Sequence, residues 1–364
     1  MKKPIIAVLT EITEKDEKEP SFKNVHSFCE ELNELVAKKD GFFYVFSLKG
    51  ISKQGVKGFY YDDGLWRKEN LPFPDVVYNR IHSRKSEASQ VFRSFIELCN
   101  DLNIKVFNQR FLSKWEVHCW LETKKNLQPF LPETKLYRES ELLRMIQHYS
   151  ELYIKPINGS QGRGIFWIKN QNNQYQLTYS EKDQLTYERF GDFYELKKAL
   201  DRKIRNIPYL IQQGLPLLHD QGKRVDFRIL CHQARIPEWS VSSVVARLSA
   251  ENHFAANLAL GGELLRPQRV LTSLFGKENT NLKITLLKEL ALESAQTISE
   301  FVPGLMIEVG IDLGINVEGN LWIIEINSKP SKNLGEQQTK IRPSARAIVD
   351  SCYNLISIDS EGEV

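Results

Sequence analysis

Short apolar runs alternate with amphipathic stretches in the first third of the chain. The runs are uniformly apolar, as is typical of strands buried on both faces, and the stretches between them repeat apolar residues at helical spacing. The runs are residues 5–9, 42–47, 76–78 and 105–108, and the helical stretches are residues 27–38 and 86–100. With an Asp-Gly hairpin signal inside residues 58–66, the pattern predicts a small α/β domain over residues 1–110.

The rest of the chain mixes helices with strands that follow one another closely. The predicted helices are residues 113–126, 139–150 and 285–301, and the predicted strands are residues 152–155, 165–169, 225–232 and 240–247. Residues 170–184 are polar and are flanked by strand-like residues, so we interpret them as a hairpin loop, with a disordered linker as the alternative. The whole pattern indicates an α/β (α+β) protein.

Two nearly continuous apolar strands, joined by a Glu-Gly turn, occupy residues 306–327. Their uniform character is typical of interior strands of a sheet. A two-residue turn at positions 318 and 319 sets Asp312 directly opposite Glu325, with Cβ atoms roughly 5 Å apart. Strand alternation then directs Asn327 to the same face.

This face of the hairpin is a cage of oxygen atoms. Like charges directly opposite each other destabilise a hairpin, whereas Mg²⁺ binds carboxylate oxygens and retains waters and phosphates as further ligands. The alternative is an ordinary hairpin with two solvated acids, but carboxylates on interior strands require partners. The pattern therefore predicts a metal–nucleotide site at Asp312, Glu325 and Asn327.

Composition and charge narrow the classes of function. The 364 residues are 41% hydrophobic and 26% charged, which is typical of a globular protein of two or three domains. The 49 basic and 46 acidic residues give a net charge of +3, which does not favour a nucleic-acid or membrane partner. No transmembrane run or signal peptide is apparent. The five cysteines are widely spaced without a CxxC pair, so we expect a protein of the reducing cytoplasm without disulfides or a zinc site.

A glycine-rich loop follows the strand that ends at Lys155. Glycine allows the backbone N–H groups to approach phosphate oxygens closely, and the lysine adds a positive charge. The loop includes Gly159, Ser160, Gln161, Gly162 and Gly164. A strand rather than a helix follows it, so it is neither a Walker loop nor a dinucleotide fingerprint, and a plain hairpin turn is the alternative.

A strand with two glutamines lies at the expected boundary between the middle and last units. It carries Gln212, Gln213 and Leu215. Clefts form at domain boundaries, and a strand edge with glutamines suits the rim of an adenine ring. A plain interdomain linker is the alternative.

Two later segments suit a phosphate. Arg228 alternates with Asp226 on one strand, so we expect Arg228 to bind phosphate with Asp226 as its orienter; a surface ion pair is the alternative. Asn257 lies in a loop of small residues that ends in Gly261-Gly262 and suits a phosphate and metal shell, although core packing explains its neighbours without function.

The order of these features resembles the ATP-grasp superfamily. A lysine, a glycine loop, a hinge strand, an arginine on a strand, an asparagine before Gly-Gly, and an Asp followed by Glu-x-Asn occur in sequence. The resemblance implies that Asp312, Glu325 and Asn327 hold Mg²⁺. It also implies that Lys155 and the glycine loop clamp ATP, that Lys114 reaches the phosphates, and that the glutamine strand is the adenine hinge.

A closer resemblance is to the YheC/YheD family, described as endospore coat-associated ATP-grasp proteins. It covers nearly the whole chain and rests on Asp63-Gly64-Leu65-Trp66, Pro72-x-Pro74-Asp75-x-Val77-Tyr78-Asn79-Arg80, Asn108-x-Arg110-Phe111, Leu131-Pro132-Glu133-Thr134 and Glu325-Ile326-Asn327-Ser328-Lys329-Pro330. Many ATP-grasp ligases continue from the metal asparagine into Pro-Gly, whereas Ser331 follows Pro330 here.

The resemblance implies an ATP-grasp fold, with α+β subdomains at residues 111–213 and 214–345 behind the N-terminal domain and a tail at residues 346–364. The implied activity is an ATP- and Mg²⁺-dependent ligase that joins a carboxylate to an amine through an acyl phosphate.

Arg228 and Lys329 are the expected catalytic residues, and Lys329, Lys332 and Arg247 indicate acidic small-molecule or peptide substrates. We expect a cytoplasmic protein associated with the spore coat. The alternative is a non-catalytic ATP-binding or structural protein of the coat.

Overall fold

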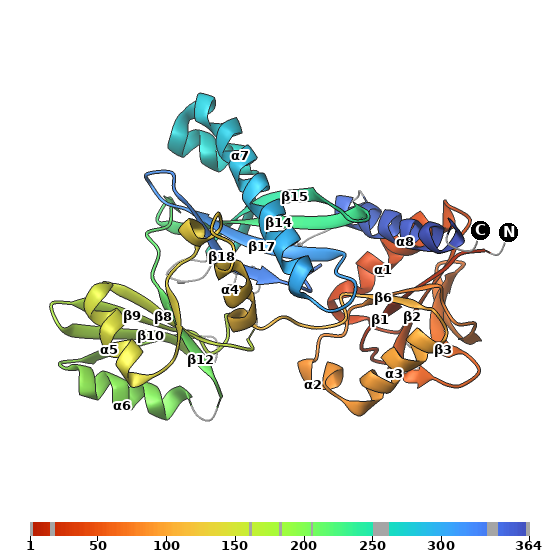
Figure 1. The fold of residues 1–364 in the computed structure, drawn as a ribbon, viewed down its shortest axis with the longest axis horizontal. Helices are drawn as coiled ribbons and strands as arrows, with labels where there is room; N and C mark the ends of the chain where they lie inside the picture. The colour runs from red at the N-terminus through yellow and green to blue at the C-terminus, as the bar shows by residue number, and fades with distance from the viewer. Residues whose placement is uncertain are drawn as a thin grey trace.

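Three six-stranded sheets follow one another along the chain, each with its own helices (Figure 1). The computed structural model describes residues 3–14, 19–159, 162–181, 184–204, 207–249, 262–332 and 341–361. The sheets lie within residues 5–107, 134–213 and 219–327, so the boundaries expected at residues 110 and 213 fall between sheets.

The N-terminal sheet has the strand order β4-β3-β2-β1-β5-β6, and β1 runs parallel to β2 and β5. All residues of β1 are buried, as its uniformly apolar sequence predicted. The bounds are β1 (Ile5–Leu9), η1 (Lys23–Val25), α1 (His26–Ala37), β2 (Phe42–Ile51), β3 (Val56–Asp62), β4 (Leu65–Leu71), β5 (Val76–Asn79), α2 (Arg84–Glu87), α3 (Gln90–Asp101) and β6 (Lys105–Phe107).

The predicted Asp-Gly hairpin joins β3 to β4. Asp62 pairs with Leu65, so Asp63 and Gly64 form a two-residue turn in which both have positive φ, at 47° and 83°. This turn matches the twist of the two strands, and glycine and aspartate tolerate its backbone better than other residues. The prediction is confirmed.

The central sheet has the order β11-β10-β9-β8-β12-β7, and its strand pairs are antiparallel. Two helices, α5 and α6, pack against one of its faces through Leu142, Leu196 and Leu200. The bounds are β7 (Thr134–Leu136), α5 (Glu139–His148), β8 (Glu151–Pro156), β9 (Phe166–Gln171), β10 (Gln174–Glu181), β11 (Gln184–Phe190), α6 (Phe193–Ile204) and β12 (Tyr209–Gln213).

The polar tract at residues 170–184 is not a loop. It contains β10, which a turn at Asn172 and Asn173 joins to β9. Within β10, the buried side chains of Tyr175, Leu177 and Tyr179 alternate with polar ones. This period-two pattern is that of a half-buried strand, and the many glutamines and asparagines concealed it.

The C-terminal sheet has the order β16-β15-β14-β17-β18 and is antiparallel in its described pairs. Helices α4 and α7 cover the face of β14 that carries Phe227 and Ile229, so Asp226 and Arg228 point to the opposite face. The bounds are α4 (Lys114–Glu122), η2 (Gln128–Phe130), β13 (His219–Asp220), β14 (Lys223–Arg235), β15 (Glu238–Leu248), β16 (Glu263–Leu265), α7 (Pro267–Phe301), β17 (Glu308–Ile315) and β18 (Leu321–Asn327).

Helix α7 is much longer than the helix predicted at residues 285–301. It begins at Pro267 and is kinked at Gly276, where φ is 75°. Gly276, Asn279 and Thr280 have low helix propensity, so the sequence pattern did not indicate the first part of this helix. No helix in the described segments is long and apolar enough to span a membrane.

Residues 346–364 were expected to form a tail, and here the structure differs. Helix α8 (Pro343–Glu361) lies against α1 and β14, as Figure 1 shows. Its Ile348, Val349 and Cys352 are buried in the core of the N-terminal domain. The end of the chain therefore completes the domain with which it begins, a pairing of distant segments that local sequence patterns do not reveal.

Truncation of Ile348 to alanine should lower the free energy of unfolding by about 2–5 kcal/mol, because the side chain is only 1% exposed and leaves a cavity. Ile358→Ala on the same helix is the control: that side chain is 48% exposed, so its loss should change stability by less than about 0.5 kcal/mol. Urea unfolding at pH 7 measures both. Equal losses of stability in the two variants would mean that the Ile348 side chain is not part of the core.

Candidate active site

Four side chains of alternating charge form a row across β15, β14 and β17, called here the charge ladder: Arg247, Asp226, Arg228 and Asp312. Strand register sets Arg247 opposite Asp226 and Arg228 opposite Asp312. Arg247 donates to both oxygens of Asp226, at 2.6 and 2.8 Å, and lies 3.1 Å from Asp312. Arg228 donates to both oxygens of Asp312. Burial raises the pKa of Asp312, but Arg228 and Arg247 outweigh it, so the pKa lies below its usual range and the carboxylate is ionised.

Asp226 was expected to orient Arg228, and that expectation is wrong. Its carboxylate is bound by Arg247 of β15, while Arg228 is bound by Asp312 of β17. The sequence placed Asp226 and Arg228 correctly on one face of β14. Which residues lie opposite them depends on the register of the neighbouring strands, and the sequence did not indicate how β15 pairs with β14.

The predicted pairing of Asp312 with Glu325 is confirmed, although the turn that was to produce it is different. Near the turn, Ile315 pairs with Leu321, and the loop is closed by Asn316, whose side chain accepts a hydrogen bond from the Asn320 N–H at 2.8 Å. This loop shifts the register by one residue. A β-bulge between the Leu313 and Asp312 pairs shifts the register back, so that Asp312 again faces Glu325.

Glu325 and Asn327 extend the polar face of the ladder to β18. The Asn327 amide nitrogen lies 3.5 Å from Asp312, and the Glu325 carboxylate lies 2.7 Å from the Lys114 ammonium. The three oxygen-bearing residues that were predicted to act together therefore lie side by side on β17 and β18. Positive side chains compensate both carboxylates.

Two lysines approach this face from other elements. Lys114 is the first residue of α4, and Ser113 and Glu116 form a capping box at this end of the helix. The Lys114 ammonium also donates a hydrogen bond to the Gly159 carbonyl at 3.0 Å. Lys155 is on β8 and donates to the Gln212 side chain at 2.5 Å. Burial lowers the pKa of Lys155 to about 8, and Glu325 opposes this effect.

A cleft lies between the central and C-terminal sheets, and its empty space of about 490 Å³ includes open solvent. Its lining is partly apolar and partly polar, and the polar part includes Lys114, Lys155, Gln212 and Glu325. The apolar wall is formed by Val117, Leu121, Leu131, Pro132 and Leu210. Such a cavity suits a ligand with a flat apolar ring at one end and negative charge at the other.

The glycine loop is described in part. Gly162 and Gly164 have positive φ, at 73° and 71°, a conformation that glycine adopts without strain. A Cβ atom at Gly159 would lie 2.7 Å from Pro156, so the chain passes too close there for a side chain. Ser160, Gln161 and Asn257 lie outside the described residues.

Of the predicted site residues, Lys114, Lys155, Gln212 and Glu325 line the cavity, whereas Gln213, Leu215 and Lys329 have their contacts elsewhere. Gln213 exchanges hydrogen bonds with Glu133, accepting at 3.1 Å and donating at 2.9 Å, and Leu215 is buried beside it outside the cavity wall. Lys329 forms an ion pair with Glu87 of α2 and donates to the Ile81 carbonyl at 3.2 Å. Its side chain is 1% exposed, so the ammonium expected to act in catalysis is held inside the protein.

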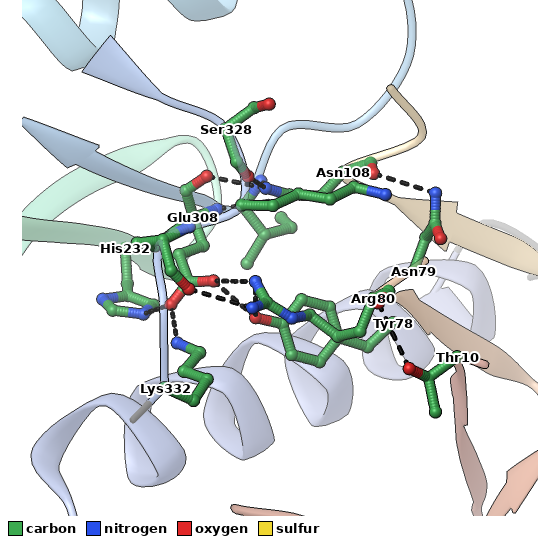
Figure 2. A network of polar contacts seen from close by, with 12 residues as sticks. Thr10, Tyr78, Asn79, Arg80, Asn108, His232, Glu308, Ser328 and Lys332 are labelled. Atoms are coloured by element: carbon green, nitrogen blue, oxygen red, sulfur yellow. Dashed lines mark hydrogen bonds and ion pairs between the residues drawn. The ribbon is translucent and has the colours of Figure 1, made fainter. Parts of the chain in front are cut away.

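Several residues of the site were not singled out from the sequence. His118 lines the cavity, and burial lowers the pKa of its ring below the usual range, so it is neutral at neutral pH. Val117 and Leu121 lie one helical turn apart on α4, a spacing that indicated a buried face but not what it faces. A second group of charged residues is buried around Glu308 (Figure 2).

The whole fold is that of ATP-grasp proteins. The D-alanine-D-alanine ligase of Coxiella burnetii superposes with a TM-score of 0.56 at 11% identity, covering 99% of this chain and 97% of that one. The D-alanyl-alanine synthetase A of Vibrio cholerae superposes with a TM-score of 0.55 at 12% identity, covering 98% and 100%. At this identity the likeness concerns the fold alone.

A profile of the family described as YheC/D like ATP-grasp matches residues 103–355, and the chain belongs to that family. The endospore coat-associated protein YheD of Bacillus subtilis is 28% identical over 324 residues, which cover 87% of this chain and 70% of that protein. The resemblance inferred from the motifs is therefore confirmed, as is the ATP-grasp fold.

Replacing Asp312 by asparagine should destabilise the protein by about 3–5 kcal/mol, because Arg228 and Arg247 would lose a buried counter-charge. Asp63→Asn is the matched control, since the Asp63 side chain is 88% exposed in a turn that asparagine tolerates. Urea unfolding at pH 7 compares the two. A loss below about 1 kcal/mol for Asp312→Asn would mean that the arginines find other partners.

Proposed function

We propose that the protein is an ATP- and Mg²⁺-dependent ligase that joins a carboxylate to an amine. The observation that carries the proposal is that Glu325 belongs both to the lining of the cavity and to the face of the sheet that carries the charge ladder. The apolar part suits adenine, and Lys114 and Lys155 suit the phosphates, while Glu325 pairs with Lys114 and lies opposite Asp312 of the charge ladder. Membership of an ATP-grasp family supports the choice of nucleotide.

The oxygen atoms on β17 and β18 fit Mg²⁺. Asp312 and Glu325 face each other, and the Asn327 amide group lies beside Asp312. No group of three or more His, Cys, Asp or Glu side chains is placed to hold a metal in the described part of the chain. The remaining ligands must then be waters and phosphate oxygens, which is how Mg²⁺ is bound beside nucleotides. When bound, Mg²⁺ supplies neutralisation of the charge on the terminal phosphates.

The side chains of this protein divide the remaining work. Lys155 and Lys114 hold the phosphates, and Lys114 exchanges its partner Glu325 for a phosphate oxygen when the nucleotide arrives. Arg228 stabilises the charge on the phosphoryl group in transfer, because its guanidinium lies at the polar face beside Asp312. Lys329 takes no part in this scheme, since Glu87 holds it.

The proposed reaction has two steps. First, a substrate carboxylate oxygen bonds to the γ-phosphorus, the bond from that phosphorus to the bridging oxygen breaks, and ADP leaves. Second, the amine nitrogen bonds to the acyl carbon, the carbon–oxygen bond to phosphate breaks, and phosphate leaves while the nitrogen loses a proton to solvent. The substrates we propose are small molecules or peptides. Association with the spore coat is proposed from the name of the Bacillus relative.

Glu325→Gln should reduce ADP release from Mg·ATP by at least about a hundredfold, since the metal and Lys114 lose a charged partner in the transition state. The assay supplies pooled amino acids and short peptides. Glu318→Gln is the control, because Glu318 is exposed in the turn of the same hairpin and should retain full activity.

Two results would change the proposal. Full activity in Glu325→Gln would exclude the metal assignment. ATP binding without substrate-dependent release in the wild type would favour the second candidate, a non-catalytic ATP-binding protein of the spore coat.

ATP affinity should fall as the pH rises above about 8. Below this pH Lys155 is protonated and its attraction for phosphate is fully present; above it the charge is lost from the free protein. Between pH 7.5 and 9 we expect a fall of up to roughly tenfold in affinity. Lys155→Arg should abolish the slope, because arginine stays protonated. Titration calorimetry at several pH values measures this, and an unchanged slope would exclude Lys155 as the titrating group.

A further inference from the structure

A second charged group is buried where the N-terminal domain meets the C-terminal sheet. Glu308, at the start of β17, is 0% exposed and is contacted by His232, Lys332, Tyr78 and Arg80, a group called here the Glu308 cluster. His232 lies 2.9 Å from the carboxylate, and Arg80 lies 3.6 Å from it. Figure 2 shows these side chains converging on the carboxylate from different segments of the chain.

The cluster holds the segment that follows the predicted metal ligand Asn327. Arg80 donates to the Pro330 carbonyl at 2.9 Å, and Lys332 forms an ion pair with Glu308. Asn108 donates to the carbonyl of Glu308, at 2.7 Å, and to that of Ser328. Residues 328–332 are therefore fixed at both ends and in the middle by groups of the N-terminal domain and β17.

The same segment is in close contact with the sheet. A Cβ atom at Gly310 would lie 2.7 Å from Pro330, so the absence of a side chain lets the segment lie directly on β17. Gly310 pairs with Asn327 and lies two residues before Asp312. The position of residues 328–332 thus bears on two of the three oxygen ligands.

The start of α4 is connected to the same segment. The Leu112 N–H donates to the Ser328 hydroxyl at 3.2 Å, two residues before Lys114. Glu87 accepts from the Phe111 N–H at 2.9 Å and pairs with Lys329. The N-terminal domain therefore holds both Lys114 and Asn327 through short stretches of chain.

Stability alone does not account for this arrangement. Burying several charges costs desolvation free energy that their attraction repays only in part, and apolar residues of similar volume often stabilise as well or better. What a buried charged cluster provides is a unique arrangement, since each polar atom must meet its partner. Here the arrangement fixes the end of β18 and the start of α4 relative to each other.

We propose that Arg80 is a positioning residue of the phosphate and metal end of the site, acting through residues 328–332 and the Glu308 cluster. The proposal rests on the proposed function. It assigns the N-terminal domain a part in metal-dependent nucleotide binding. The apolar part of the cavity is formed partly by Leu131, Pro132 and Leu210, which lie outside the segments that the Glu308 cluster holds, so binding of the adenosine part should depend little on Arg80.

The test compares ATP affinity in MgCl₂ and in EDTA, by calorimetry, for wild type, Arg80→Met and Arg80→Lys. The ratio of ATP affinity in MgCl₂ to that in EDTA should be at least about tenfold smaller in Arg80→Met than in wild type, as for substitutions next to metal ligands. The affinity in EDTA should stay within about twofold of the wild-type value. Arg80→Lys keeps the charge and one donor and should recover part of the gain. The control is Tyr44→Phe, which removes a partly buried hydrogen bond of 2.8 Å to the Pro72 carbonyl in the same domain and should leave both affinities unchanged.

The outcomes separate the inference from the proposed function. A full Mg²⁺ gain in Arg80→Met overturns the positioning role, and so does an equal loss in MgCl₂ and EDTA, which would indicate general destabilisation. A wild type without any Mg²⁺ gain contradicts the metal assignment instead. Hydrogen exchange then decides on positioning: peptides covering residues 108–113 and 327–332 should exchange faster in Arg80→Met, and unchanged rates overturn the proposal. If Arg80→Met does not fold, Tyr78→Phe removes one contact of the same cluster with little change of shape.

Discussion

Asp312 lies buried in the middle of the C-terminal sheet, where an ionised carboxylate is stable only beside compensating charge. Arg228 and Arg247 provide it from β14 and β15, so three strands must keep one register for the site to exist. The same constraint divides the sheet. Its polar face carries the charge ladder, and its other face carries apolar side chains that pack against α4 and α7. A slip of one residue would exchange the two faces.

The cavity depends on this face but is built from parts of two sheets. Lys155 and Gln212 come from the central sheet, Glu325 comes from the C-terminal sheet, and Lys114 stands at the start of the helix between them. Ion pairs and hydrogen bonds hold the lysines against acidic and amide groups in this structure. Under the proposed function, a polyphosphate with its cation would replace these contacts charge for charge, which would keep the desolvation cost of binding low.

The N-terminal domain is more closely integrated than a domain joined by a linker. Helix α8 packs into its core, and Glu308 is contacted by Tyr78 of β5 and by Arg80, which follows that strand. These contacts are buried and polar, so they favour one relative position over neighbouring ones. This geometry explains why Lys329 is held by Glu87 rather than directed at the cavity.

Much of the fold and part of the site followed from the sequence, because periodicity and turn chemistry act over a few residues. Apolar runs identified the buried strands, Asp63-Gly64 specified a hairpin, and strand alternation placed Asp312, Glu325 and Asn327 together. The partner of Asp226, the docking of α8 and the Glu308 cluster join residues far apart in the chain. They depend on strand register across the sheet and on how whole elements pack, which short-range patterns do not encode; only the tertiary structure decided them.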